Sequence, residues 1–274
     1  MPINDSDVRY WNSPAPNEAT CRALRDPVIV LPLAATEQHG PHLPLSTDVD
    51  IGLGILNETF LRLDRSIPAW TLPIETVGAS LEHVRYDGIT SVTPNELVQT
   101  IFNHGERLST LGIRRLVISN SHGGNSAPIE SAALRLREEC ELLVVKANYY
   151  RFERPVDIDL PEIEWRHGLH GGAVETAMML HLRQESVRTD AINTFPSIAE
   201  ELETRGSRIL PTGPAAFAWL AGDLNPLGVV GDATLASEEL GRKLIVHYAA
   251  ILADIIKDAY HFPIERLNQR DRSK

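Results

Sequence analysis

The chain has 274 residues, 43% of them apolar, and a formal net charge of −11 from 37 acidic and 26 basic side chains. Binding to nucleic acid or to an anionic membrane needs clustered lysine and arginine, so this charge argues against both as partners. The length and the apolar content suit a single α/β domain over residues 1–274 with a sizeable core.

The N-terminal segment and the two cysteines bear on the location of the protein. Residues 1–7 include acidic side chains where a secretory signal peptide has basic ones, and no apolar run is long enough to span a bilayer. Cys21 and Cys140 are too few for a disulfide framework and are expected to stay reduced. These features predict a cytoplasmic protein.

Strand and helix signals alternate along the first half of the chain. A capping box, Thr93-Pro94-Asn95-Glu96, begins one helix, and Gly112 ends it. In chain order, the predicted elements are a strand over 28–33, a helix over 48–63, a helix between Thr93 and Gly112, a strand over 116–119, a helix over about 127–139 and a strand over 142–147. This alternation predicts an α/β fold with a mainly parallel sheet.

The second half of the chain has weaker signals. Residues 150–168 and 193–230 are rich in proline, glycine and charge, which predicts long loops over a ligand crevice. Trp165 and Trp219 lie in these loops, where a tryptophan is at least as often a packing anchor as a substrate cover. A last helix over about 233–258 is amphipathic and could pack on the sheet or on a neighbouring subunit.

A first cluster of polar side chains follows the strand over 28–33. Glu37 and His39 are two residues apart, so on an extended segment both leave the same face. Asp48 joins them if the Gly40-Pro41 and Leu43-Pro44 steps fold the chain back. Oxygen and imidazole ligands together suit Zn, Mn or Fe better than Ca or Mg. Most isolated Glu-x-His pairs are ordinary surface residues, so the prediction of a metal site depends on further clusters.

Two further clusters supply such residues. His122 directly follows a predicted strand, where ligand crevices of parallel sheets lie, although it could also cap the next helix. In the third cluster, His167 and His170 precede two glycines that permit close backbone approach, and Glu175 follows on a predicted helix. Together the clusters offer more ligands than one ion needs. Two ions bridged by a carboxylate would acidify a shared water, which could then attack a carbonyl or amidine carbon.

These residues carry a resemblance to the creatininase family of metal-dependent amidohydrolases. Residues 37–48 match the family pattern E-Q-H-G-P-H-L-P-x-x-T-D, residues 120–125 match N-x-H-G-G-N, and residues 170–176 match H-A-G-x-x-E-T in all but its second position. Residues 78–83 and 228–234 match two further family segments more weakly. The resemblance implies a three-layer α/β/α fold.

The resemblance also implies roles for individual residues. The metal ligands would be Glu37, His39, Asp48 and His122, with Asp48 bridging, and His170 would protonate the leaving nitrogen. Creatininase itself has a glutamate ligand at the position of Gly124, and Glu175 is the expected replacement, either as a ligand or in catalysis. Many relatives have an acidic residue at the position of Ala173.

The implied activity is hydrolysis of a non-peptide C–N bond in a small cyclic amide or formamide, with one or two divalent ions per chain. Zn is expected first, with Mn or Fe as the other choices. Two alternatives within the family are deformylation of a formamidopyrimidine and trimming of a peptide. An alternative from another class is a metal-binding oligomeric scaffold without catalysis. A homo-oligomer, hexameric in the family, is expected.

Overall fold

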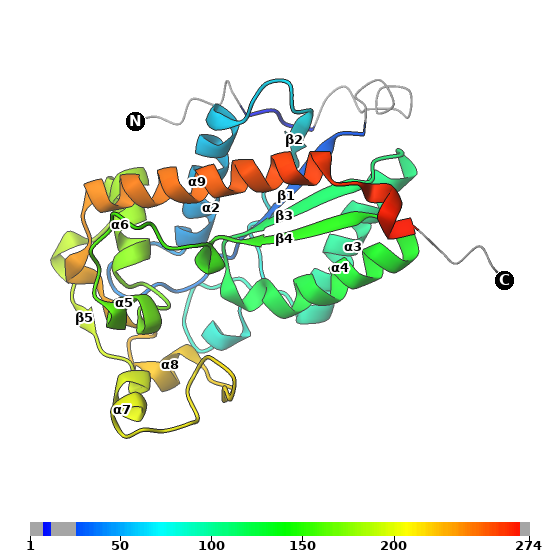
Figure 1. Ribbon diagram of the computed structural model, residues 1–274. Coiled ribbons are helices and arrows are strands. Elements are labelled where there is room, and N and C mark those ends of the chain that lie inside the picture. Colours follow the sequence, from blue (N-terminus) through cyan, green and yellow to red (C-terminus); the bar gives the residue numbers. More distant parts are fainter. Residues whose placement is uncertain (1–7, 12–25, 269–274) are drawn as a thin grey trace.

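A four-stranded sheet lies between two layers of helices in the computed structural model, which describes residues 8–11 and 26–268 (Figure 1). All four strands are parallel and follow the order β2-β1-β3-β4. Their bounds are β1 Val28–Leu33, β2 Ala69–Thr71, β3 Arg115–Asn120 and β4 Leu143–Asn148. The predicted parallel sheet and three-layer α/β/α architecture are confirmed. Strand β2 has no counterpart among the predicted elements, because three residues are too few to show a period.

The side chains of β1 alternate between two apolar cores. The main helices are α2 Thr47–Arg62, α3 Pro94–Thr110, α4 Ser126–Cys140, α6 Ala173–Leu182 and α9 Glu238–His261. Val28 and Val30 belong to the core with α2, α6 and α9. Ile29 and Leu31 belong to the core with α3 and α4 on the opposite face. Because helices cover both faces, every residue of β1 is buried, which explains its uninterrupted apolar sequence.

The ends of two helices test the sequence signals directly. The predicted capping box forms at α3: the Glu96 N–H donates to Thr93 Oγ1 at 3.3 Å, and the Thr93 N–H donates to Glu96 Oε2 at 2.7 Å. Helix α9 begins five residues later than predicted, at Glu238, because the Ser237 hydroxyl caps it. Its apolar face packs on α2 and α6 within the same chain.

The prediction of long loops is only partly right. The two segments contain helices α5 Glu162–His167, α7 Ile198–Thr204 and α8 Ala221–Leu224. They also contain strand β5 Thr194–Phe195, which pairs antiparallel with β6 Gly231–Asp232 just after the second segment. Helix α7 has its own capping box, formed by Ser197 and Glu200. That signal is present in the sequence as S-x-x-E. Helices α7 and α8 lie beyond the end of the main sheet, away from α3 and α4 (Figure 1).

The described residues also include seven short 3-10 helices: η1 Leu81–His83, η2 Gly123–Asn125, η3 Tyr149–Arg151, η4 Gln184–Ser186, η5 Thr189–Ala191, η6 Ala233–Leu235 and η7 Ile264–Asn268. Within the described ranges, no helix is both long and apolar enough to cross a membrane. Cys140 is a free, half-buried thiol at the end of α4. Cys21 and residues 1–7 lie outside the described residues.

Candidate metal centre

The register of the sheet brings three chain segments to one edge. Leu33 pairs with Asn120, and Asn120 pairs with Asn148, so β1, β3 and β4 end level with one another. The segments that leave these ends carry the first two polar clusters and the turn η3. The third cluster enters the same space from the loop before α6. All six residues predicted for the site converge there: Glu37, His39, Asp48, His122, His170 and Glu175.

Asp48 lies at the middle of this group, in the first turn of α2. One of its carboxylate oxygens, Oδ1, lies 3.3 Å from His39 Nε2, and the other, Oδ2, lies 3.3 Å from His122 Nδ1. Glu37 Oε1 lies 3.1 Å from the same His122 nitrogen, and Glu175 Oε2 lies 3.8 Å from His39 Nε2. The carboxylate of Asp48 therefore faces two imidazoles, and each imidazole faces a second carboxylate.

Hydrogen bonds on the far sides of the two rings determine which nitrogen carries a proton. We assign His39 Nδ1 as the donor to the Glu37 carbonyl and His122 Nε2 as the donor to the Ala79 carbonyl, both at 3.1 Å. In the neutral rings, His39 Nε2 and His122 Nδ1 then present lone pairs to the carboxylates. This backbone-anchored arrangement is typical of histidines that bind metals.

Unpartnered atoms support the same interpretation. Glu37 Oε2, His39 Nε2 and Asp48 Oδ2 are buried and make no hydrogen bond within the described part of the molecule. A buried polar atom without a partner costs roughly 1–3 kcal/mol. A divalent cation among these atoms would satisfy all three, so the donor set fits a metal centre.

Without a metal, the histidines carry the compensating positive charge. Burial opposes protonation of His39, but Asp48, Glu175 and Glu37 outweigh it and raise its pKa to about 9. Burial also lowers the pKa of His122, but the adjacent carboxylates of Glu37 and Asp48 outweigh this effect and raise the pKa well above its usual value. The site is therefore strongly selective for positive charge, whether protons or metal ions supply it.

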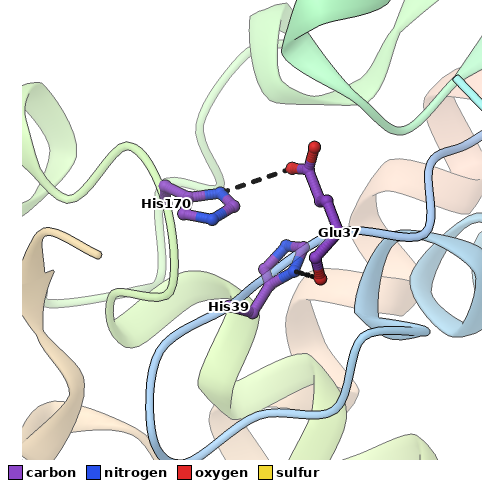
Figure 2. Close-up of side chains that lie close together, drawn as sticks. All are labelled: Glu37, His39 and His170. Atoms are coloured by element: carbon purple, nitrogen blue, oxygen red, sulfur yellow. Dashed lines mark hydrogen bonds and ion pairs between the residues drawn. The ribbon is translucent and has the colours of Figure 1, made fainter. Parts of the chain in front are cut away.

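His170 lies at the edge of the group, and a backbone carbonyl fixes the side of its ring that faces away from Glu37. Its Nε2 donates to the Gln38 carbonyl at 2.7 Å. Its Nδ1 lies 3.8 Å from Glu37 Oε1 (Figure 2). Its ring lies 4.2 Å from that of His39, measured between centroids. Burial, and then the nearby His39, lower the pKa of His170, so its ring is neutral at neutral pH. Its position beside Glu37 and His39 suits either a ligand or a proton carrier.

Two further side chains of the site, Glu82 and His83, were not among the predicted residues. His83 is 2% exposed, with Nε2 at 3.5 Å from Glu37 Oε1 and its ring 4.5 Å from that of His170. Glu82 Oε1 lies 3.5 Å from His122 Nε2. Both belong to the weakly matching segment 78–83, which was the available signal. Burial, and then His170, lower the pKa of His83 to about 3.

The structure explains why residue 124 is a glycine. A Cβ at this position would lie 2.3 Å from the Ala79 carbonyl oxygen and 2.5 Å from Glu82 Oε1. The first contact is with backbone, so no side chain fits here without movement of the loop. The glutamate ligand of creatininase itself therefore has no room at Gly124, and the Glu82 carboxylate lies beside that position instead.

Two other histidines of the polar clusters have structural roles. His42 Nε2 lies 2.9 Å from Thr176 Oγ1 and 3.0 Å from the Gly171 carbonyl, and so connects the first motif to the third. His167 lies 2.8 Å from Glu203, away from the metal centre, and joins α5 to α7. Of the two histidines in the third cluster, only His170 therefore reaches the site.

A cavity of about 810 Å³ opens over the metal centre. The acids of the site and the histidines His83, His122 and His170 form one part of its lining, and aromatic and aliphatic residues form much of the remainder. Trp165 and Trp219 both line it, and the Trp219 indole N–H donates to the Pro211 carbonyl at 2.9 Å. Both tryptophans therefore face the space in which a substrate would lie.

A buried carboxylate, Glu164, holds the loop that carries His170. Its two oxygens accept hydrogen bonds from the N–H groups of Ala173 and Asp232, both at 2.6 Å. Added Cβ atoms at Gly168, Gly172 and Gly231 would each lie within 2.8 Å of Glu164 Oε1, so these glycines leave room for it. Ala173 is fully buried at the start of α6, and its backbone N–H donates to the Glu164 carboxylate.

We expect Glu164→Gln to lower the free energy of unfolding by about 2 kcal/mol, because the amide NH₂ would replace one acceptor of a charge-assisted hydrogen bond. The melting temperature should fall by roughly 5 °C in a chain of this size. Glu162→Gln on the same helix is the matched control, since Glu162 forms an exposed ion pair with Arg154. Equal melting temperatures for the two variants in calorimetry would contradict this role for Glu164.

Comparison with known proteins places this site in a family. The family profile described as creatininase, creatinine amidohydrolase, matches residues 15–256. The mycofactocin precursor peptide peptidase of Mycobacterium ulcerans (strain Agy99) is 34% identical over 227 residues, 80% of each chain. The creatinine amidohydrolase of Pseudomonas putida is 28% identical over 255 residues, 87% of this chain and 92% of that protein.

Solved structures give the same result. A creatininase in a Mn form matches with a TM-score of 0.69 and 26% identity, covering 89% of this chain and 95% of that chain. A mutant creatininase of Zn-Zn type matches with a TM-score of 0.71 and 25% identity, covering 89% and 94%. Fold, motifs and the carboxylate–imidazole cluster agree, and the chain belongs to the creatininase family of metal-dependent amidohydrolases.

Proposed function

We propose that this protein binds two divalent ions and hydrolyses the C–N bond of an amide substrate larger than creatinine. The observation that carries the metal part of the proposal is the Asp48 carboxylate, whose two oxygens face the lone pairs of two different imidazoles. Glu37, Asp48 and His122 would hold one ion, and His39, Asp48 and Glu175 the other. The bound ions would supply an acidified water and polarise the substrate carbonyl.

The protein's own groups would then direct the proton. His170 is neutral at neutral pH and presents Nδ1 to the site, so it can accept a proton as water attacks and pass it to the leaving nitrogen. The Gln38 carbonyl holds the opposite side of the ring during both transfers. Glu175 is oriented by the Gly171 N–H at 2.6 Å and by the Tyr149 hydroxyl at 3.4 Å.

The size of the cavity guides the proposal about the substrate. About 810 Å³ falls within the range of roughly 300–1,000 Å³ that encloses drug-sized ligands. A single small lactam or formamide would leave most of this space to water. A peptide-like amide fits better, and the relative that is 34% identical is named a peptide peptidase. We therefore place the peptide-trimming alternative ahead of the small cyclic amide or formamide expected from the sequence.

Zn is the first choice of metal, with Mn second and Fe third, because imidazole and carboxylate ligands suit all three and the matching creatininases include Zn and Mn forms. A homo-oligomer, hexameric by resemblance to the family, is part of the same proposal. A scaffold without catalysis is less well supported, since a structural metal site would need neither His170 nor an open cavity.

Creatinine should be a poor substrate. With Zn or Mn bound, we expect a creatinine kcat/KM below about 10⁴ M⁻¹s⁻¹, the lower end for enzymes on their own substrates. Short peptides and N-acyl amino acids should be hydrolysed faster. Ninhydrin detects the amines released from the peptides and N-acyl amino acids, and chromatography detects the creatine formed by ring opening of creatinine. Creatinine turnover above that value would contradict the proposed substrate class.

Metal affinity should rise with pH. A metal binds only the neutral imidazole, and without metal His39 stays protonated until the pH approaches its raised pKa of about 9. For each proton that the metal displaces, the metal affinity rises about tenfold per pH unit as long as the pH is below the pKa of that histidine. Competition with a chelator between pH 6 and 9 measures this slope. An affinity independent of pH across that interval would show that His39 and His122 are not ligands.

A further inference from the structure

One arginine faces the cavity over the metal centre. The lining includes five carboxylates, namely Glu37, Asp48, Glu82, Glu164 and Glu175, and Arg151 is its one lysine or arginine among the described residues. We propose that Arg151 binds a free carboxylate of the substrate. Trp165 and Trp219, which form the aromatic wall of the cavity, would hold an apolar side chain of the substrate next to that carboxylate. The substrate would then be an N-acyl amino acid or a short peptide with a free C-terminus. This inference rests on the proposed amide hydrolysis.

The position of Arg151 is set by its two neighbours in η3. This turn follows β4 directly, at the edge of the sheet that carries the metal centre. The Tyr149 hydroxyl lies 3.4 Å from Glu175, a proposed metal ligand. The Tyr150 hydroxyl lies 2.8 Å from Ser126 Oγ and accepts from Asn120 Nδ2 at 3.1 Å. Of these three consecutive residues, Tyr149 contacts the metal centre, Tyr150 contacts the cavity wall, and Arg151 would contact the substrate.

The surroundings leave the Arg151 guanidinium free to pair. Neighbouring arginines have carboxylate partners: Arg154 pairs with Glu162, and Arg166 pairs with Glu203. Arg151 has no carboxylate within ion-pair distance in the described ranges, and its guanidinium lies 6.0 Å from the centre of the Tyr150 ring. The Arg151 side chain is exposed, so the guanidinium stays hydrated until a substrate binds.

The distribution of charge separates two functions within the cavity. Four of the five carboxylates, all but Glu164, collect around the metal centre, where a scissile amide is neutral and the ions balance the negative charge. An anionic group of the substrate is better placed away from them, and a guanidinium binds one carboxylate through two parallel hydrogen bonds. Phosphate sites are more often built from several donors, commonly at a helix N-terminus. A single arginine therefore favours a carboxylate.

The aromatic wall supplies the second part of the recognition. Trp165 packs beneath the Arg154 guanidinium, whose carbon lies 5.3 Å from the ring centre, and Trp219 is held by its bond to Pro211. Both rings are anchored by groups outside the cavity, so they can contact a ligand at little cost in side-chain entropy. With the exposed side chain of Leu169, they form a surface suited to an apolar amino-acid side chain.

The test uses the metal-loaded full chain and paired substrates. N-acyl dipeptides ending in phenylalanine or tyrosine are offered as free acids and as C-terminal carboxamides, together with a phosphorylated formamide. The wild type should prefer the free acid by about 10- to 100-fold in kcat/KM, the usual effect of a hydrogen-bonded charge pair. In Arg151→Gln this ratio should approach one, mainly through a raised KM for the free acid. In Arg151→Lys it should be intermediate, because an ammonium lacks the planar fork.

Arg135→Gln is the matched control, since Arg135 lies on α4, is absent from the cavity lining and pairs with Glu139. It should keep the wild-type ratio. A wild type without preference, an unchanged ratio in Arg151→Gln, or an Arg151-dependent preference for the phosphorylated formamide would overturn the proposal. Titration of N-acyl-tyrosine and its carboxamide, followed by tryptophan fluorescence, gives an independent result. If no amide is hydrolysed, the proposed function fails, whereas tighter binding of the free acid that is lost in Arg151→Gln still supports carboxylate recognition.

Discussion

Asp48→Ala should lose both metal and activity, with kcat/KM falling by at least about a thousandfold, because bound metal supplies several kcal/mol of transition-state stabilisation. The loss follows from the position of Asp48 between His39 and His122, at 3.3 Å from each. Removing this carboxylate would take a ligand from both proposed ions and leave the two imidazoles facing each other. Metal content per chain after dialysis and reconstitution is the measurement.

Asp50→Ala is the matched control for this variant. Asp50 lies in the same first turn of α2, but its carboxylate accepts from Ser46 at 2.7 Å and from Arg183 at 3.1 Å. It should therefore keep its metal. Asp48→Asn preserves the shape of the side chain and removes its charge, which separates loss of ligation from loss of packing. A full complement of metal in Asp48→Ala would refute the bridging role.

His170→Ala should keep most of its metal and lose turnover by roughly a hundredfold or more, the usual contribution of a positioned general acid. The reason is that His170 is fixed by the Gln38 carbonyl and has one ring nitrogen directed to the site. The decrease should appear in kcat with little change in KM. Added imidazole should restore part of the rate, because the cavity of about 810 Å³ can admit it.

His167→Ala is the control here, because His167 belongs to the same third cluster but pairs with Glu203. Its turnover and metal content should remain close to those of the wild type. The informative failure is loss of metal in His170→Ala. His170 Nδ1 lies 3.8 Å from Glu37 Oε1, and such a result would assign His170 as a ligand.

Local sequence signals predicted much of the fold. The strands over β1, β3 and β4 and the start of α3 agree with the structure, because burial on both faces and helix capping leave local patterns. Elements without such patterns were missed. Strand β2 is three residues long, and α5 is one short helix within a segment rich in charge. The start of α9 was misplaced because the 233–235 turn continues the helical pattern.

The candidate site shows the same division. The sequence alone determined the chemical types and the family, since carboxylates, imidazoles and glycines at these spacings are specific to it. Only the tertiary structure showed that His83 and Glu82 join the site, that His167 does not, and that Gly124 has no room for a side chain. The physical reason is that distances between segments depend on the register of parallel strands and on the packing of distant loops. Neither the strand register nor the packing of distant loops can be predicted from the residues of one segment alone.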